Sequence, residues 1–404
     1  MKILIANAIY PTDAFPDSLG GAEKSVRKIA QGLADLGHEV HVVAPLGPSQ
    51  DRVDEDFNGV HVHRLPTRNI YDFHQDKSPN PAKRLAWHLI DDLGIAPADF
   101  GKLIDTVHPD VLHTNTLSGL SSGLWKIASK RGVPVVHTLR DYYLMCTRCT
   151  LFRKEKICEK ACADCTVVTQ GRKARTRYVD GVVGNSKFTL DLHLDAGLFP
   201  NTVIQQPIGS ITEAQSVATE IASPKRAADA PVVFGYIGRL SPTKGLDQVL
   251  EAVTQCTDNA RLVIAGSVDT DLGQELVARF GDNDRVTFAG FVSPQELYDQ
   301  VDVIVAPSLW YEPLPRSVVD ALSFGKPVVG SNRGGTPEAM GTPPRGWVYD
   351  PAQPNDLRLA LKHAIDWARS GTPFDPLPVK ETSVLDAYLN VYQATIDAHK
   401  AAAP

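Results

Sequence analysis

Short hydrophobic runs alternate along the chain with longer segments in which hydrophobic residues recur every three or four positions. The short runs predict buried strands, and the longer segments predict amphipathic helices. The first run, at 2–7, is followed by a helical stripe that Gly37 ends, and then by a second run. The stripe contains Val26, Ile29, Ala30, Leu33 and Leu36, and the second run begins with Val40, Val42 and Val43. Strand, helix and strand in this order predict a parallel sheet.

The same order recurs through the first half of the chain. We predict strands at 110–114, 134–139, 180–186 and 202–207, and helices at 118–131 and after a cap at Ser186. Open α/β sheets bind ligands beyond the carboxyl ends of their strands. Four polar residues lie there and are candidates for the acceptor side of a site, although a histidine at a strand end is also a common hydrogen-bonded structural residue. They are His113, Asn115, His137 and Arg140.

The second half repeats the plan after a segment without periodicity, 208–230, which is rich in Ala, Ser and Thr. We predict strands at 260–266, 285–292, 301–308 and 327–331, and helices at 271–280, near 353–369 and near 383–398. Ser293 and Glu296 have the spacing of a capping box. The sequence therefore predicts an α/β protein with domains at 1–207 and 231–382, a linker at 208–230, and a C-terminal helix in 383–404 long enough to reach back to the first domain.

The stretch 307–327, PSLWYEPLPRSVVDALSFGKP, combines an aromatic loop with a short helix. Pro315 suits the first helical position and Gly325 suits the end, which predicts a helix at 315–324. Glu312 precedes this helix and Asp320 lies two turns inside it, so the two carboxylates can flank a ligand held at the helix N-terminus. Leu314 and Arg316 supply nearby backbone N–H groups. The alternative is an amphipathic helix whose carboxylates face water.

Two glycine-containing loops are candidates for binding phosphate. Arg239 and Lys244 flank the loop that follows Gly238, where two cations and a helix N-terminus can converge on one diphosphate. The alternative is a pair of surface charges. Gly20 and Gly21 stand where the first loop meets its helix, where they either admit a ligand to the backbone or serve a turn with positive φ. No GxGxxG follows the first strand, so a dinucleotide fingerprint is absent.

Composition narrows the class of protein. The chain has 404 residues, 43% hydrophobic and 22% charged, with a net charge of −6. This balance argues against a protein that binds nucleic acid with its whole surface, although it leaves a local basic patch open. No apolar run is long enough for a membrane-spanning helix, and MKILIANAIYP is interpreted as a buried strand rather than a signal peptide. Five of the six cysteines fall within 146–165 rather than forming a spread framework, which favours a reducing cytoplasm.

The clustered cysteines have the spacing of a metal site. Cys146 with Cys149, and Cys162 with Cys165, form two CxxC pairs separated by twelve residues. This spacing predicts a structural zinc site without a catalytic role, with Cys158 as an alternative ligand. An iron–sulfur cluster, reduced thiols or a redox pair are the alternatives.

The segment 148–177 carries nine Lys or Arg against three acidic residues. Its charge suits an anionic acceptor such as a lipid diphosphate, or peripheral contact with an anionic membrane, at the inner face in a bacterium. A merely solvated basic face is the alternative.

The chain contains the motifs GGAE, GRLSPTKG and EPLPRSVVDALSFGKPVVGSNRGGTPE. Through these motifs, nearly the whole chain resembles the family 4, or group 1, retaining glycosyltransferases of GT-B fold. HTLRDYYLMC resembles a bacterial subgroup. The resemblance implies two Rossmann-like domains facing a cleft, an NDP-sugar (UDP, GDP or dTDP) held mainly by the second, and a glycan or lipid-linked acceptor bound mainly by the first.

Residue roles follow from the same resemblance. It implies that Arg239 and Lys244 hold the diphosphate, Glu312 the sugar hydroxyls, Asp320 the ribose and Val292 the base, with Gly20 and Gly21 on the diphosphate and acceptor side. No cofactor is required for catalysis. The chain departs from the family pattern at three positions: Asp320 replaces Glu, Asn115 replaces His and Pro315 replaces Gly.

Two other functions fit the same residues. One is a nucleotide-sugar epimerase of GT-B fold, which product identity distinguishes from a transferase. The other is a non-catalytic nucleotide-sugar or carbohydrate-binding protein, which would show no turnover. The donor, the acceptor and the linkage depend on side chains in 8–19 and 66–96, where the sequence has little pattern.

Overall fold

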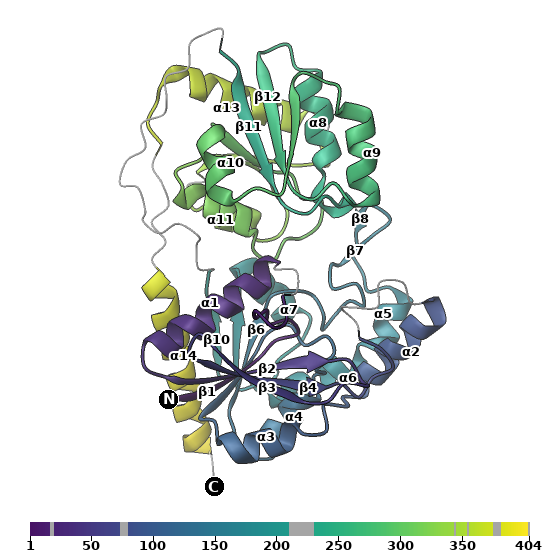
Figure 1. The fold of residues 1–404 in the computed structure, drawn as a ribbon, viewed down its shortest axis with the longest axis vertical. Helices are drawn as coiled ribbons and strands as arrows, with labels where there is room; N and C mark the ends of the chain where they lie inside the picture. The colour runs from purple at the N-terminus through teal and green to yellow at the C-terminus, as the bar shows by residue number, and fades with distance from the viewer. Residues whose placement is uncertain are drawn as a thin grey trace. The chain divides into compact units, whose positions relative to one another are not determined.

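A computed structural model describes residues 1–16, 20–72, 80–209, 230–342, 345–353, 355–374 and 381–402 (Figure 1). Most of the predicted linker therefore lies outside the described residues. The chain divides into two compact units. The first contains Met1–Leu151, Cys158–Ile211 and Glu381–Pro404, and the second contains Phe152–Ile157 and Thr212–Lys380. The short segment 152–157 thus groups with the second unit although its flanks belong to the first.

The first unit is built on an eight-stranded sheet with the order β10-β9-β6-β5-β1-β2-β4-β3. All neighbours are parallel except β3 and β4. Its strands are β1 (Lys2–Ala6), β2 (Glu39–Leu46), β3 (Val53–Phe57), β4 (Val60–Pro66), β5 (Val111–Thr114), β6 (Val135–Leu139), β9 (Gly181–Gly184) and β10 (Ile204–Pro207). Because parallel strands need crossover connections, helices separate most of them along the chain.

The helices of this unit are α1 (Gly21–Asp35), α2 (Pro81–Asp92), α3 (Phe100–Val107), α4 (Gly123–Ser129), α5 (Ala163–Val168), α6 (Gln170–Arg175), the 3-10 helix η1 (Thr176–Tyr178), α7 (Lys187–Asp195) and α14 (Glu381–Ala402). Ser186 caps α7, as predicted, by accepting a hydrogen bond from the Thr189 N–H. The helix predicted at 118–131 is wrong at its start, because α4 begins only at Gly123. Gly119 and Ser121 adopt positive φ values of 88° and 70°, which interrupt a right-handed helix.

The final helix, α14, belongs to the first unit. Its apolar face packs into the same core as β1, β2 and α1, with Leu385, Tyr388 and Tyr392 buried. Gly32 of α1 lies against Leu385, where a side chain at position 32 would overlap it. Figure 1 shows α14, in yellow, beside β10 and α1, from the opposite end of the chain. Residues 381–402 therefore complete the core of a unit that otherwise ends near residue 211.

The second unit has a six-stranded parallel sheet with the order β13-β12-β11-β14-β15-β16. Its strands are β11 (Val232–Ile237), β12 (Ala260–Ala265), β13 (Val286–Gly290), β14 (Val303–Ala306), β15 (Val328–Ser331) and β16 (Gly346–Tyr349). β16 was not predicted. β14 and β15 are buried along their whole length and β11 is mostly buried, as expected for a parallel sheet covered on both faces.

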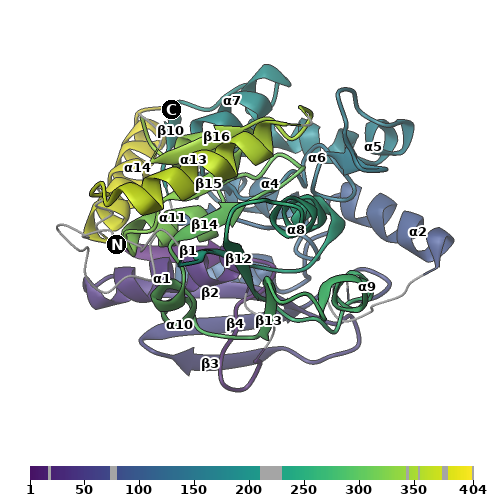
Figure 2. The same cartoon turned by 90° about the horizontal axis from the view of Figure 1, so that it is seen from above.

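The helices of the second unit are η2 (Pro242–Lys244), α8 (Leu246–Thr254), α9 (Asp271–Phe280), α10 (Pro294–Gln300), α11 (Arg316–Ser323), α12 (Thr336–Ala339) and α13 (Asp356–Ser370). The capping box predicted at the start of α10 is confirmed, with both the Ser293 and Glu296 side chains bonded to backbone N–H groups. Figure 2 shows α13 running beside β15 and β16. Grouped with this unit is the hairpin of β7 (Phe152–Arg153) and β8 (Lys156–Ile157).

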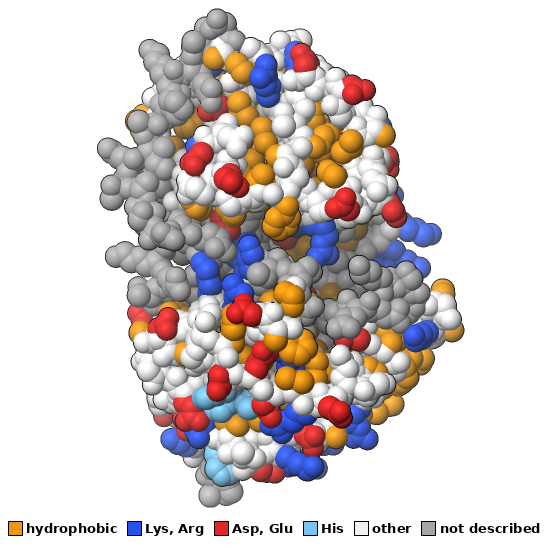
Figure 3. All heavy atoms as spheres, viewed as in Figure 1, with side chains coloured by type: hydrophobic (Ala, Val, Ile, Leu, Met, Phe, Trp, Pro, Cys, Tyr) orange, Lys and Arg blue, Asp and Glu red, His pale blue; other side chains and the backbone are white. Residues whose placement is uncertain are grey.

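One feature of the first sheet had no counterpart in the sequence prediction. Three histidine rings lie together on β2 and β4. The ring centroid of His41 is 4.8 Å from that of His61 and 5.2 Å from that of His63. Acidic side chains of the neighbouring positions accept from these rings. Figure 3 shows histidine side chains gathered beside acidic ones on the surface of this unit.

No helix among the described residues is long and apolar enough to cross a membrane.

Candidate active site

Two loops of the second unit lie side by side at the carboxyl edge of its sheet, because β11 and β14 are neighbours there. The Leu309 N–H of one loop donates to the Thr243 carbonyl of the other at 2.8 Å. Gly245 has φ +63° and faces the Pro307 carbonyl so closely that a Cβ atom would overlap it. The glycine of the KG pair is therefore needed both for its backbone conformation and for the approach of the two loops.

Glu312 is the centre of this arrangement. Its side chain is buried, and three donors converge on Oε1: the Lys244 ammonium, the Ser308 hydroxyl at 2.7 Å and the Trp310 indole N–H at 2.8 Å. Buried carboxylates need such partners because an unpaired charge is expensive to remove from water. The structure thus brings together Lys244 and Glu312, which are 68 residues apart in sequence. Ser308 and Trp310 were not singled out from the sequence.

The glycine loop that follows β15 holds the backbone of Glu312. The Gly335 N–H donates to the Glu312 carbonyl at 2.7 Å, and Gly334 has φ +62°. A Cβ on Gly334 would overlap the Glu312 backbone oxygen. Ser331, at the end of β15, donates to the Ser308 carbonyl at 2.7 Å. Glu312 is therefore fixed from two sides, by its side-chain donors and by this loop.

The second carboxylate of the stretch lies within α11. Asp320 is buried, and its Oδ2 is 3.5 Å from Nη2 of Arg316, one turn earlier. This result excludes the alternative in which the carboxylates of an amphipathic helix face water. Gly325, with φ +71°, ends the helix as predicted. Pro315 is the residue before the helix rather than its first helical residue, with ψ 105°, which corrects the predicted start.

Arg239 and Gly238, the candidates in the loop after β11, are less buried than Glu312 and Asp320. The Arg239 side chain is exposed, and its carbonyl accepts from the Tyr236 hydroxyl at 2.8 Å. The structure therefore places Arg239 in the loop with Lys244 but assigns its guanidinium no ion pair among the described residues. The Gly238 N–H donates to the Ala265 carbonyl, which ties the loop to β12.

Two hydrophobic candidates pack on a core cluster of the second unit. Val292 and Leu314 are partly buried against it. Beside Val292, just past the end of β13, Phe291 is 93% exposed. Sequence analysis did not single out Phe291, because hydrophobic composition alone does not reveal exposure.

In the first unit, Gly20 and Gly21 begin α1 without positive φ. The turn explanation for this pair is therefore wrong. At Gly20 a Cβ would overlap the Glu23 carboxylate, which is a flexible side-chain end.

The two histidine candidates lie in the core, in contrast to the expectation that they face an acceptor. His113 is fully buried, with Nε2 2.7 Å from the Thr138 hydroxyl and Nδ1 2.7 Å from the Tyr392 hydroxyl. His137 is bonded to the Thr114 hydroxyl at 2.9 Å. Burial lowers the pKa of both, to about 3 for His137. Both rings are therefore neutral structural groups.

The polar residues after these strands form a network at the sheet edge. Arg140 donates through Nε to Asn115 Oδ1 at 2.7 Å and through Nη2 to the Tyr388 hydroxyl at 3.3 Å. Asp141 was not predicted, although it adjoins Arg140. It accepts from the Tyr143 N–H at 2.8 Å, and burial raises the pKa of its carboxyl to about 6. Asn115, Arg140 and Asp141 thus supply donors and a titratable acid at this edge.

The basic segment 148–177 is less free than its charge implies. Arg172 is fully buried and lies 3.0 Å from Asp91 Oδ2, and Tyr143 also donates to that carboxylate. Arg175 donates to the Asp92 carbonyl at 2.7 Å, and Arg148 pairs with Asp164 at 3.5 Å. Arg172 is therefore neutralised by an acid outside the segment, Arg148 is paired with an acid inside it, and Arg175 is held by a backbone carbonyl. A count of charges within the segment does not reveal these partners.

The sequence of the chain matches two protein-family models. The family model described as Glycosyl transferases group 1 matches residues 218–368, and the model described as Glycosyl transferase 4-like domain matches residues 20–209. An uncharacterized 42.6 kDa protein in the cps region of Klebsiella pneumoniae is 32% identical over 339 residues, covering 84% of this chain and 87% of that protein. A GDP-mannose-dependent alpha-mannosyltransferase of Mycobacterium tuberculosis is 25% identical over 364 residues, covering 87% and 86%.

Solved structures show the same fold at low identity. Sucrose-phosphate synthase from Thermosynechococcus elongatus superposes with a TM-score of 0.65 at 19% identity, covering 99% of this chain and 98% of that one. Anabaena Alr3699/HepE in complex with UDP-glucose superposes with a TM-score of 0.59 at 19% identity, covering 99% and 100%. Together with the two family models, these similarities show that the chain belongs to the group 1 glycosyltransferases and has the GT-B fold.

Proposed function

We propose that this glycosyltransferase moves a sugar from a nucleoside-diphosphate sugar to a glycan or lipid-linked acceptor, with retention of anomeric configuration, during assembly of a surface polysaccharide. The observation that carries the proposal is the convergence of Lys244, Ser308 and Trp310 on Glu312. The relative from a cps region supports the polysaccharide assignment, and the complex of Alr3699/HepE with UDP-glucose supports a nucleotide-sugar donor.

On this proposal, Glu312 binds hydroxyl groups of the donor sugar. The described donors all go to Oε1, so Oε2 is the oxygen that accepts from the sugar. Asp320 binds the ribose hydroxyls, with the helix N-terminus of α11 and the Leu314 backbone beside the diphosphate. Val292 contacts the base through its backbone, and the exposed ring of Phe291 beside it offers a face on which the base stacks.

Lys244 has a second task in this mechanism. An ammonium group carries three N–H donors, so Lys244 can hold Glu312 and still reach a diphosphate oxygen. Charge that develops on the leaving diphosphate is stabilised by Lys244 and by the exposed guanidinium of Arg239. The sugar leaves the diphosphate as its anomeric C–O bond breaks, and the acceptor oxygen bonds to the same face while its proton passes to the departing phosphate. No protein nucleophile is required.

We assign acceptor binding to the first unit, at the edge formed by Asn115, Arg140 and Asp141, with Gly20 and Gly21 open to the acceptor at the start of α1. Exposed basic residues of 148–177 would then favour an anionic acceptor or membrane surface. In the first unit they include Lys160 and Arg177.

A donor screen tests the first half of the proposal. Thermal unfolding of the full chain would be followed with UDP-, GDP- and dTDP-sugars, since a ligand at 100 times its Kd stabilises by about 2.7 kcal/mol. We expect one nucleotide to raise Tm strongly, and the Glu312→Gln protein to bind the free nucleotide diphosphate while losing preference for the sugar-bearing form. A chain that binds none of the nucleotide sugars contradicts the proposal.

A turnover assay tests the chemistry. Lys244→Ala is expected to lower kcat by about 100-fold or more, as the loss of one preorganised donor does elsewhere. Lys362→Ala is the matched control, because Lys362 also pairs with a carboxylate but on the exposed surface of α13. Coupling constants of the product's anomeric proton distinguish retention from inversion, and product identity distinguishes transfer from epimerisation. Near-normal turnover in a folded Lys244→Ala protein would contradict the role proposed for Lys244 at the leaving diphosphate.

A further inference from the structure

The helix α2 of the first unit turns polar side chains inward and apolar side chains outward. Its buried residues are Trp87, His88 and Asp91. Leu85, Leu89 and the C-cap residue Leu93 are 50%, 44% and 69% exposed. Residues at this spacing lie on one side of a helix, so the three leucines form a stripe. A helix that faces only water shows the opposite arrangement, with its leucines inside and its acids outside.

The two acidic residues of α2 are held within the unit. Asp91 Oδ2 lies 3.0 Å from Nη2 of the fully buried Arg172. The Asp92 carboxylate accepts from the backbone N–H groups of Gly171 and Arg172, both at 2.9 Å. These contacts fix the rotation of α2 about its own axis, because they pull one side of the helix toward α6. The leucine stripe is therefore kept on the outside by bonds that the leucines do not make.

The exposed charge of α2 is positive. Lys83 and Arg84 are exposed, and the Lys83 ammonium lies 5.0 Å from the centroid of the Tyr71 ring, a partner without charge. Both acids in 81–93, a stretch that the structure describes completely, are held inside the unit, so this face presents cations and leucines together. Apolar side chains combined with Lys and Arg are typical of helices that lie on an anionic membrane surface.

The neighbouring helix α5 has the same character. Figure 1 shows α5 beside α2, and the two helices are in contact. Val167 of α5 is 65% exposed. The one acidic residue of α5, Asp164, pairs with Arg148 at 3.5 Å. α5 therefore adds an exposed apolar side chain next to α2, while its carboxylate is matched by a cation of the same unit.

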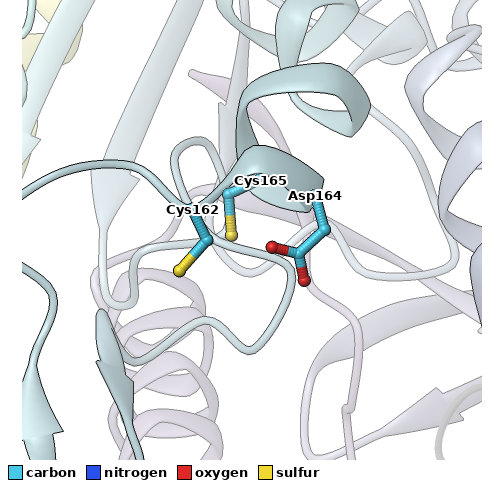
Figure 4. A group of neighbouring side chains, drawn as sticks. All are labelled: Cys162, Asp164 and Cys165. Atoms are coloured by element: carbon cyan, nitrogen blue, oxygen red, sulfur yellow. The ribbon is translucent and has the colours of Figure 1, made fainter.

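Asp164 also belongs to a group of side chains at the start of α5. The thiols of Cys162 and Cys165 and the Asp164 carboxylate lie within 4.8 Å of one another. Figure 4 shows these three side chains at the first turn of the helix. The structure thus brings together Cys162 and Cys165 of the predicted zinc ligands, and the complete set with Cys146 and Cys149 stays a prediction.

We propose that the leucine stripe of α2 docks on an anionic lipid bilayer. Leu85, Leu89 and Leu93 enter the boundary between headgroups and acyl chains, and Lys83 and Arg84 bind lipid phosphates. This inference rests on the proposed function, in which the acceptor is lipid-linked, and it names the surface that brings the enzyme to such an acceptor.

Charge favours a bilayer over a second copy of the chain. A twofold interface brings the same patch of both copies together, so Lys83 and Arg84 would face the same two cations. An anionic bilayer instead offers negative charge across its whole surface. The chain carries a net charge of −6, which opposes general attraction to such a surface. Binding is therefore confined to a face where cations and apolar side chains coincide, and salt weakens it.

Vesicle flotation of the full chain, without donor or acceptor, tests the proposal. We expect binding to phosphatidylcholine vesicles that contain phosphatidylglycerol, and little binding to phosphatidylcholine alone. The double variant Leu89→Ser, Leu93→Ser should bind about tenfold more weakly or less, because it removes apolar area from the contact. Leu359→Ser is the matched control, since Leu359 is 55% exposed on a helix of the second unit, and it should bind like the native chain.

A second pair of proteins tests the role of charge. The double variant Lys83→Gln, Arg84→Gln should lose the preference for anionic vesicles and the sensitivity to salt. Lys102→Gln combined with Lys130→Gln changes the net charge equally at two exposed lysines elsewhere in the first unit. This control should keep the preference. Equal loss in the two double variants would show that net charge, rather than the α2 face, decides binding, and would overturn the proposal.

A tryptophan in the stripe reports the contact directly. Brominated lipids should quench the emission of Leu89→Trp more than that of the native chain, and should leave Leu359→Trp unchanged. Native protein that does not float with anionic vesicles overturns the proposal. So does self-association in analytical ultracentrifugation that the leucine substitutions abolish. Nucleotide-sugar binding by the same proteins separates the two claims: donor binding without vesicle binding contradicts this inference alone, whereas absence of donor binding contradicts the proposed function.

Discussion

The Tyr392 hydroxyl bonds to Nδ1 of His113 at 2.7 Å, across 279 residues of sequence. His113 lies on β5 in the middle of the first sheet, and Tyr392 lies on α14, the last helix of the chain. Tyr388, one turn earlier, bonds to Arg140 at 3.3 Å. The C-terminal helix therefore contacts both the core of the first unit and the sheet edge at which we propose that the acceptor binds.

Tyr392→Phe is expected to destabilise the protein by about 1–3 kcal/mol, because it leaves a buried imidazole nitrogen without its partner. The urea midpoint of the first unfolding transition measures this. Gln393→Ala, on the exposed side of the same helix, should shift stability by less than about 0.5 kcal/mol. Equal effects of the two substitutions would contradict the role assigned to the bond.

Gly334→Ala should impair the donor site beyond its effect on stability. A Cβ at this position overlaps the Glu312 backbone, and φ +62° adds roughly 1 kcal/mol of strain. Gly132→Ala is the matched control, since Gly132 has φ +69° but no atom within 4 Å of the added Cβ. We expect similar strain in both proteins and weaker nucleotide-sugar binding by calorimetry only for Gly334→Ala. Unchanged binding would show that the loop does not position Glu312.

Acid should destabilise the first unit through its buried histidines. Burial lowers the pKa of His88 and His193 to about 4 and that of His137 to about 3. Because these folded values lie below the unfolded value near 6.5, the unfolded chain binds protons first. Stability is therefore complete above about pH 6.5 and is lost as the pH falls toward 4, by on the order of 2 kcal/mol per histidine at pH 5.

Asp141 acts in the opposite direction, because its raised pKa lets the folded state bind a proton below about pH 6. The three histidines outweigh this single carboxyl. Urea midpoints at pH 7.5 and pH 5.0 measure the net effect, and NMR signals of the buried rings should not titrate above pH 5. A midpoint that rises on acidification would refute the prediction.

Removing one partner of the buried Asp91–Arg172 pair should cost about 3–5 kcal/mol, because the other charge is left uncompensated. Arg172→Met tests this by thermal unfolding. Lys187→Met removes a cation from an exposed pair with Asp191 and should have little effect. If Arg172→Met is tolerated as well as Lys187→Met, the basic segment is a solvated face after all.

Hydrophobic periodicity was sufficient to predict a helix or strand wherever the pattern lies within that element alone. The strands and helices of the second unit up to α11, and the capping box at Ser293, were predicted close to their observed bounds. The prediction was poorest between 46 and 110, where β3, α2 and α3 have short or weak patterns. It also extended α4 too far toward the N-terminus, because positive φ at Ser121 is a property of the folded turn rather than of a serine.

The candidate site was also predicted only in part from the sequence. The residue types and motifs identified Lys244, Glu312 and Asp320 one by one, and the family resemblance assigned them a common ligand. Only the folded structure shows that Lys244 and Trp310 both bond to Glu312 and that His113 is buried in the core.

The sequence by itself determined the α/β class, the repeated strand–helix units and the chemical character of the donor loops, because these depend on side chains near in sequence. Tertiary structure decided which distant groups became partners. Whether α14 completed the first unit, and whether Lys244 met Glu312, depended on the direction in which each loop left its strand. That direction is set by the packing of the whole unit, which local spacing does not encode.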